Sequence, residues 1–164
     1  MIQFSVQSQY FNSDWHLSFS VWYDASMKFK YTPQMSDLDD CPPMMAKSEG
    51  RTAFRYVHAD TSHPNNAPPE AIINPARFPP GHPIPCVAFG LSLFVSLDAA
   101  KRKYRQLQKW PNFVKRVGSH VATVTIVETD GVLTNCNEQG HITLFEAEAF
   151  DLKARIVDTV EIIP

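Results

Sequence analysis

Apolar and polar residues alternate in the segments Trp15–Tyr23 and Thr52–Ala59. A period of two is the signature of a half-buried strand, so both segments are predicted to be extended. A weaker strand is expected at Gln3–Tyr10. Later in the chain, a strand at His120–Glu128 is expected to turn through a hairpin at residues 129–131. Two more strands are expected at Ile142–Phe145 and Ala154–Ile163.

The middle of the chain contains a strand that leads directly into a helix. The run Val87–Val95 is almost continuously apolar, which favours a central strand buried on both faces. Ser96 follows in the position of a helix N-cap, and Asp98 suits the same helix end electrostatically. The spacing predicts a helix over Leu97–Gln108. Its buried stripe consists of Leu97, Ala100, Tyr104 and Leu107.

Between residues 64 and 85 the chain carries eight prolines, at positions 64, 68, 69, 75, 79, 80, 83 and 85. Proline removes amide donors and fixes φ, so this segment is predicted to be neither helix interior nor central strand. Its apolar residues favour a packed loop, and we expect residues 60–86 to form a wall or lid over a cleft. The pattern as a whole predicts one strand-rich α+β domain spanning residues 1–164, with one main helix.

Composition narrows the classes of function. The chain has 164 residues, 44% of them hydrophobic, and a net charge of −2, so a general nucleic-acid or membrane-surface binder is not expected. No apolar run approaches the ~20 residues that cross a bilayer, and the N-terminus lacks the features of a secretion signal. A cytoplasmic location is therefore expected. The three dispersed cysteines are interpreted as thiols in a reducing compartment, and a structural zinc is not expected.

Several polar residues have both a structural and a functional interpretation. Arg55 lies mid-strand between aromatic residues, and either a salt bridge at the sheet edge or a ligand explains it. The basic run between Lys101 and Arg116 is more typical of a solvated helix face than of a surface that attracts phosphate. Glu146 and Glu148 share a face if the segment is extended, and two such carboxylates raise each other's pKa. Taken alone, this E-x-E is more typical of a solvated strand edge.

Taken together, these elements resemble the R–S–E pattern of the ADP-ribosyltransferase-like fold, over roughly residues 52–163. Arg55 in the sequence FRYVH resembles the arginine that holds NAD. The segment Ser92–Ser96 takes the place of the serine-containing strand, and Glu146-Ala147-Glu148 resembles the late E-x-E. The sequence NPARFPPG (74–81) is similar to a loop in small bacterial proteins of the related R–Y–E type, in which Arg77 would compete with Arg55.

The resemblance implies an NAD-using ADP-ribosyltransferase-like enzyme, such as a toxin or a modifier of a cellular protein target, with NAD as its substrate. It implies that Glu148, with Glu146, is catalytic. The residues expected to bind NAD are Arg55, His58, Ser92, Phe94 and Arg77. The alternative is a non-catalytic domain that binds a nucleotide or a protein. An RNA-binding domain that uses residues 101–116 is less well supported, because the strands offer few aromatic residues for stacking.

Overall fold

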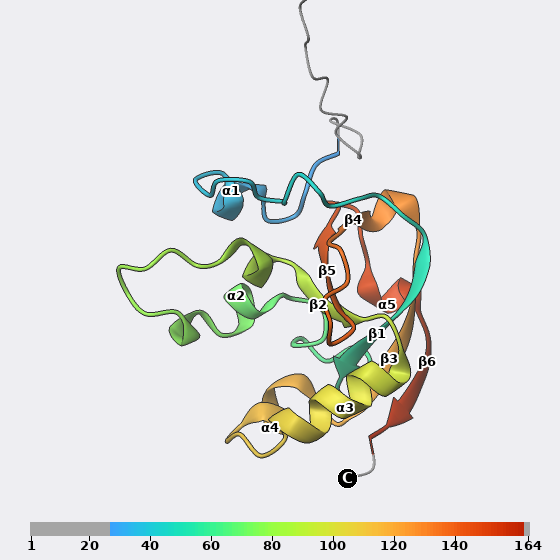
Figure 1. Cartoon of the computed structure of the whole chain (residues 1–164). Helices are drawn as coiled ribbons and strands as arrows, with labels where there is room; N and C mark the ends of the chain where they lie inside the picture. Colours follow the sequence, from blue (N-terminus) through green and yellow to red (C-terminus); the bar gives the residue numbers. More distant parts are fainter. Residues whose placement is uncertain (1–26, 163–164) are drawn as a thin grey trace, which may run out of the picture.

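The computed structural model describes residues 27–162, which form an α+β fold built on one antiparallel six-stranded sheet (Figure 1). The strand order is β4-β5-β2-β1-β3-β6. The strands are β1 (Arg51–Val57), β2 (Leu91–Phe94), β3 (His120–Ile126), β4 (Gly131–Leu133), β5 (His141–Glu146) and β6 (Ile156–Glu161). The strands predicted at Gln3–Tyr10 and Trp15–Tyr23 lie outside the described residues.

Helices are short apart from one. The α-helices are α1 (Thr32–Met35), α2 (Glu70–Ile73), α3 (Leu97–Leu107), α4 (Phe113–Val117) and α5 (Leu152–Arg155). Single 3-10 turns are η1 (Pro75–Arg77), η2 (Cys86–Phe89) and η3 (Glu128–Asp130). Within residues 27–162 no helix has the length and apolarity required to cross a membrane.

Helix α3 forms as its sequence predicts. The Ser96 side chain accepts a hydrogen bond from the backbone N–H of Ala99 and so caps the helix. Ala100 and Tyr104 of the predicted stripe are buried against one face of the sheet. Phe113 of α4 joins the same cluster. This packing fixes α3 and α4 together on one side of the sheet.

The opposite face of the sheet is covered by the segment around α5. Phe150 and Leu152 pack there against Leu93, Leu144 and other strand residues. Strand β1 contributes to both faces, as its alternation predicts, because Val57 belongs to this cluster while Tyr56 packs with α3.

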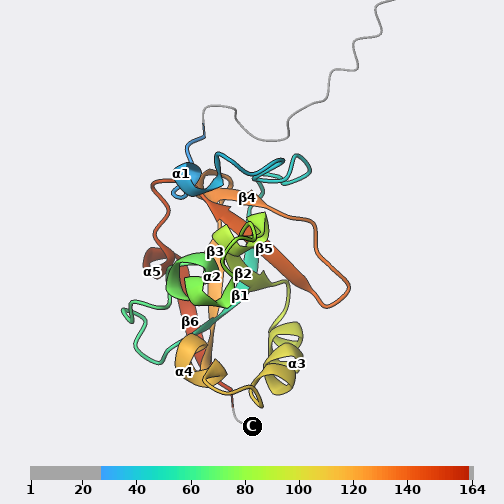
Figure 2. The ribbon, with the colours of Figure 1, turned by 90° about the vertical axis from the view of Figure 1, so that its left-hand side faces the viewer.

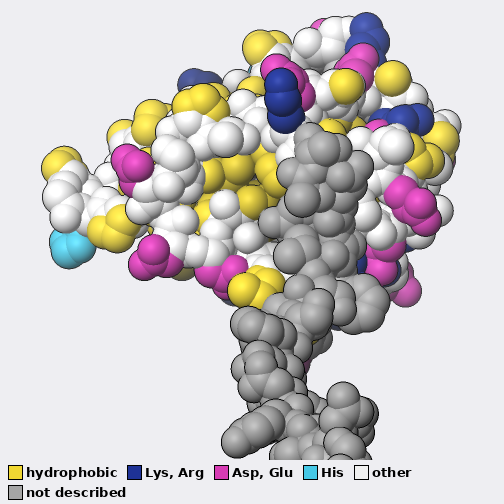
Figure 3. Space-filling view, turned by 90° about the horizontal axis from the view of Figure 1, so that it is seen from above, with side chains coloured by type: hydrophobic (Ala, Val, Ile, Leu, Met, Phe, Trp, Pro, Cys, Tyr) yellow, Lys and Arg dark blue, Asp and Glu magenta, His cyan; other side chains and the backbone are white. Residues whose placement is uncertain are grey.

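A third cluster forms where the N-terminal described segment and the Pro-rich segment meet β4 and β5. Met35 of α1, Ala71 of α2 and Phe89 of η2 pack there on Val132 and Phe145. Viewed from above, apolar side chains gather in a shallow hollow on this side of the molecule (Figure 3).

Three predictions about the strands were wrong in part. The strand predicted at Ala154–Ile163 begins only at Ile156, because Leu152–Arg155 form α5. Strand β2 begins only at Leu91, because residues 86–89 form the turn η2 and Val87 is 53% exposed. The expected hairpin through residues 129–131 is absent, since β3 pairs with β1 and β6 whereas β4 pairs with β5. The chain therefore leaves β3, near one edge of the sheet, and crosses to β4 at the opposite edge. In sequence, an apolar run whose first residues form a turn looks like a longer strand, and a Gly-containing loop that crosses the sheet looks like a hairpin.

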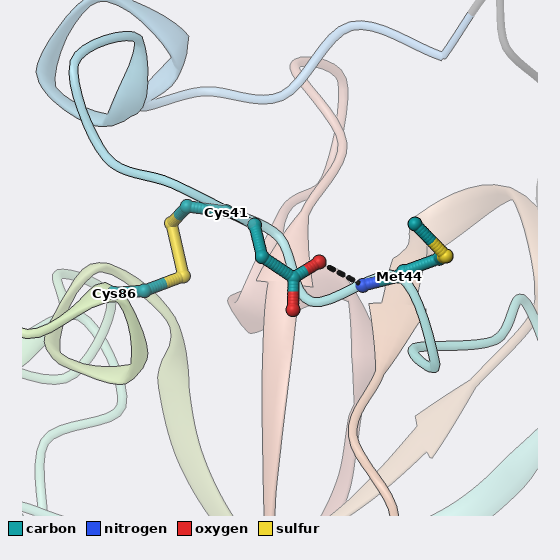
Figure 4. The surroundings of a disulfide bond; sticks show 4 residues. Cys41, Met44 and Cys86 are labelled. Carbon is teal, nitrogen blue, oxygen red and sulfur yellow. Dashed lines mark hydrogen bonds between the residues drawn. A yellow bond between two sulfur atoms is a disulfide. The ribbon is translucent and has the colours of Figure 1, made fainter.

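The expectation that all three cysteines are thiols was also wrong. Cys41 and Cys86 form a disulfide that ties the segment before β1 to η2 (Figure 4). Nearby, the Asp40 carboxylate accepts a hydrogen bond from the backbone N–H of Met44. Cys136 is free and exposed. Disulfides persist mainly in oxidising compartments, so this bond weighs against the expected cytoplasmic location.

Candidate functional site

A cavity of about 950 Å³ lies on the sheet face that carries α3 and α4. Side chains of β1, β2 and β5 form its floor, α3 and α4 form one wall, and the Pro-rich segment forms the other. Figure 2 shows α2 in front of the sheet, with α3 and α4 below it. The Pro-rich segment thus forms the cavity wall predicted for it, although it contains the short helix α2 and the turns η1 and η2.

Aromatic side chains make up much of the apolar part of the cavity. Tyr56 packs on Phe94 with ring centroids 5.2 Å apart and on Phe113 at 6.0 Å. Phe78 lines the cavity from the Pro-rich segment, and Trp110 lines it while remaining 67% exposed. Aromatic faces of this kind stack well on planar ligand rings.

Cationic side chains line the same cavity. Arg77, Lys103 and Arg116 come from η1, α3 and α4. The Arg77 side chain is 61% exposed, and it lies 3.4 Å from the Glu70 carboxylate. Arg116 lies 3.5 Å from the same carboxylate. Positive charge therefore exceeds negative charge in the lining.

Ser92 and His141 form a hydrogen-bonded pair on the cavity floor. Their positions on the neighbouring strands β2 and β5 place Ser92 Oγ 2.7 Å from His141 Nε2. Burial lowers the pKa of His141, and the nearby Lys103 lowers it further. The imidazole is therefore neutral near pH 7, and its Nε2 can accept the hydrogen bond from the Ser92 hydroxyl.

Arg55 lines the cavity, but each nitrogen of its guanidinium is already bonded. Nε donates to the carbonyl of Asn66 at 2.8 Å, Nη1 to that of Ser92 at 3.0 Å, and Nη2 to that of Pro68 at 3.2 Å. Strands β1 and β2 share a single register pair, Phe54 with Phe94, so Arg55 bonds across the gap where the strands separate. The guanidinium of Arg55 therefore bonds to backbone carbonyls of the protein itself.

The two glutamates of the E-x-E are not among the residues that line this cavity. Residues in a strand alternate between faces, so Thr143 faces the cavity and Glu146 points to the other side. Glu146 is 2% exposed and forms an ion pair of 2.9 Å with Lys30. Glu148 is exposed in the turn after β5.

The buried environment of Glu146 disfavours the ionised form of its carboxyl group. Burial raises the pKa of Glu146, and the hydrogen bond from Lys30 only partly opposes this. Its Oε2 atom is buried without a hydrogen-bond partner. Burial, with a smaller contribution from Glu146, raises the pKa of Tyr31 to about 12. Glu146 is thus part of a buried polar cluster with Lys30 and Tyr31 outside the cavity lining, and it interacts electrostatically with Arg55, which does line the cavity.

His58 is also outside the cavity lining. Its ring stacks on that of His63 with centroids 3.6 Å apart, and its Nε2 lies 3.3 Å from the carbonyl oxygen of Arg116. Among the predicted ligand-binding residues, the fold therefore brings Arg55, Arg77, Ser92 and Phe94 to one cavity and leaves His58 out.

No family model, curated protein or solved structure matches the chain. The assignment of the site consequently rests on its geometry. Among the described residues, no group of His, Cys, Asp and Glu is arranged to hold a metal ion.

Several residues of the cavity were not recognised from the sequence as parts of a site, among them Glu70, His141 and Arg116. Glu70 is an isolated acid in the Pro-rich segment, and His141 is one of six dispersed histidines. Arg116 belongs to the basic run that was interpreted as a solvated face. Most of that run is exposed as predicted, but Arg116 and Lys103 turn towards the cavity. Only the basic run gave any signal for these contacts.

Proposed function

We propose that this protein binds a nucleotide in the 950 Å³ cavity, with NAD as the first candidate ligand. The observation that supports this best is the combination of aromatic side chains with the cations Arg77, Lys103 and Arg116 in one lining. Planar bases stack on aromatic rings, and phosphates pair with arginine and lysine. The volume lies at the upper end of the range of ligand pockets, which suits a ligand with two bases.

Ribose and base recognition can be assigned to the cavity floor. Ser92 and His141 offer a hydroxyl and an imidazole to sugar hydroxyls or to an amide group. The neighbouring Phe94 and Tyr56 offer apolar rings beside them. This part of the proposal keeps Ser92, Phe94 and Arg77 as ligand contacts and gives Arg55 a supporting role.

Binding is better supported than ADP-ribosyl transfer. Transfer requires a carboxylate that stabilises positive charge developing on the ribose. Glu146 points away from the cavity and Glu148 is exposed outside it. Glu70 does line the cavity, but its carboxylate is paired with Arg77 and Arg116. A transferase activity remains a second proposal, and Glu70 is the residue through which it would be tested.

Isothermal titration of the purified protein with NAD tests the proposal. We expect saturable binding that Ser92→Trp abolishes, because an indole placed on the floor fills the space for a base. Glu148→Gln is the matched control outside the cavity and should bind as the wild type does. A folded wild-type protein that binds neither NAD nor ADP-ribose would refute the proposal.

The same samples separate binding from transfer. Release of nicotinamide from NAD, followed by chromatography, should be absent if the domain only binds. Nicotinamide release that Glu70→Gln stops and Glu148→Gln does not would identify Glu70 as the carboxylate required for transfer. The binding-only proposal would then be wrong.

A further inference from the structure

A second recess of about 480 Å³ adjoins the cavity. Five residues line both spaces, so the recess is a polar extension of the cavity. They are Asn65, Ile73, Asn74, Pro111 and Arg116. Asn112 and Lys115 line the recess alone. Side-chain amides and two cations dominate this space, in contrast to the aromatic floor of the main cavity.

Arg116 stands at the boundary between the two spaces and is incompletely paired. Its Nε atom is buried without a hydrogen-bond partner. The distance from Nε to Glu70 Oε1 is 3.5 Å, longer than the 2.7–2.9 Å typical of a charge-assisted hydrogen bond. A buried guanidinium nitrogen without a hydrogen bond is costly, so an anion with better geometry would be stabilised here.

Glu70 holds the cations together through one oxygen. Its Oε1 accepts a hydrogen bond of 3.1 Å from the Asn74 side chain, and it is also the atom closest to Arg77 and Arg116. One carboxylate oxygen thus sits where three donors converge. This position suits an oxygen of an anionic ligand, and in this structure the Glu70 carboxylate oxygen occupies it.

We propose that the recess around Arg116 and Lys115 is the phosphate subsite of the nucleotide site, and that a ligand phosphate displaces the Glu70 carboxylate from Arg116 and Arg77. This inference rests on the proposed function, and it moves phosphate recognition away from Arg55. A phosphate offers several oxygens to planar guanidinium groups, whereas Glu70 offers one at long range. The base then lies over the aromatic floor of the main cavity.

Calorimetric titration with inorganic pyrophosphate, adenosine and AMP tests the assignment. The wild type should bind pyrophosphate and should bind AMP more tightly than adenosine. Arg116→Gln should weaken pyrophosphate and AMP by about tenfold or more and leave adenosine unchanged, because hydrogen bonds between charged groups are worth at least that much. Lys115→Gln, at an exposed position, should act in the same direction without any effect on folding. Arg105→Gln removes the same charge outside both spaces and is the control.

Glu70→Gln should change the affinity for pyrophosphate in the opposite direction. With the competing carboxylate removed, pyrophosphate affinity should rise severalfold. If Glu70 only clamps α2 to α4, the same variant should lower both the affinity and the melting temperature, and the displacement proposal would be overturned.

The outcomes separate this inference from the proposed function. Binding of NAD that is unaffected by Arg116→Gln and Lys115→Gln would refute the subsite and keep the function. Binding of pyrophosphate without any binding of NAD or adenosine would keep the anion subsite and refute the function. A protein that binds none of these ligands refutes both.

Discussion

At the scale of single residues, Arg55 is a buried cation whose bonds are to the backbone. Burial lowers the pKa of Arg55 to about 10, and Glu146 and Tyr31 partly oppose this, so the side chain is still charged at neutral pH. Its three carbonyl partners come from the Pro-rich segment and from β2. Arg55 thereby holds the cavity wall to the sheet at the point where β1 and β2 separate.

Replacing Arg55 with alanine should therefore affect folding before it affects binding. The change leaves three carbonyls without a donor, and we expect a loss of roughly 3 kcal/mol or more in the free energy of unfolding. Urea denaturation followed by circular dichroism measures this. Arg77→Ala, at an exposed side chain, should change stability by less than about 0.5 kcal/mol. Equal stabilities for the two variants would contradict the structural role of Arg55.

Glu146 gives a prediction with a definite pH dependence. Its pKa is raised in the folded protein, so the folded state favours the protonated form, and the stability that this group contributes falls as the pH rises through the folded-state pKa. Glu146→Gln cannot ionise and should raise the melting temperature at pH 8 more than at pH 4. If the ion pair with Lys30 outweighed burial, the variant would instead be destabilised at pH 8.

At the scale of elements, helix α3 depends on its first turn. Ser96→Ala removes the side chain that accepts from Ala99 and should cost about 1 kcal/mol, whereas Ser96→Gly should cost only a few tenths. Thermal and urea denaturation of the two variants measure the difference. A smaller loss for alanine than for glycine would show that helix propensity matters more here than the cap.

The local pattern of apolar and polar residues predicted the individual helices and strands better than it predicted which strands pair. The alternation in β1 and the capped stripe of α3 are each encoded within a few residues, and both are confirmed. The hairpin between β3 and β4 failed because pairing depends on distant partners, and β5 lies closer in space to β4 than β3 does. The disulfide joins cysteines that are 45 residues apart, and no local signal marks such a pair.

At the scale of the whole molecule, the candidate site lies between the sheet, the helices α3 and α4, and the Pro-rich segment. Its residues come from positions as distant as Arg77, Arg116 and His141, and only the folded sheet brings them together. The sequence predicted the Pro-rich wall and four of the lining residues. Glu146 and Glu148 are not in the lining, and their sequence pattern could not predict this, because the pairing of β5 and the turn after it decide where their side chains lie.

The Cys41–Cys86 disulfide ties the Pro-rich wall to the N-terminal described segment, so its reduction should act on both stability and binding. Closing a loop of 45 residues lowers the entropy of the unfolded chain, which corresponds to about 4 kcal/mol in the chain-entropy model. We expect a reducing agent to lower the melting temperature and weaken NAD binding, because η2 and α2 lose this tether. The double variant Cys41→Ser, Cys86→Ser should reproduce both effects and be insensitive to the reducing agent. Cys136→Ser, at the exposed free thiol, should respond to reduction as the wild type does. An unchanged melting temperature in the double variant would show that the bond contributes nothing to holding the wall in place.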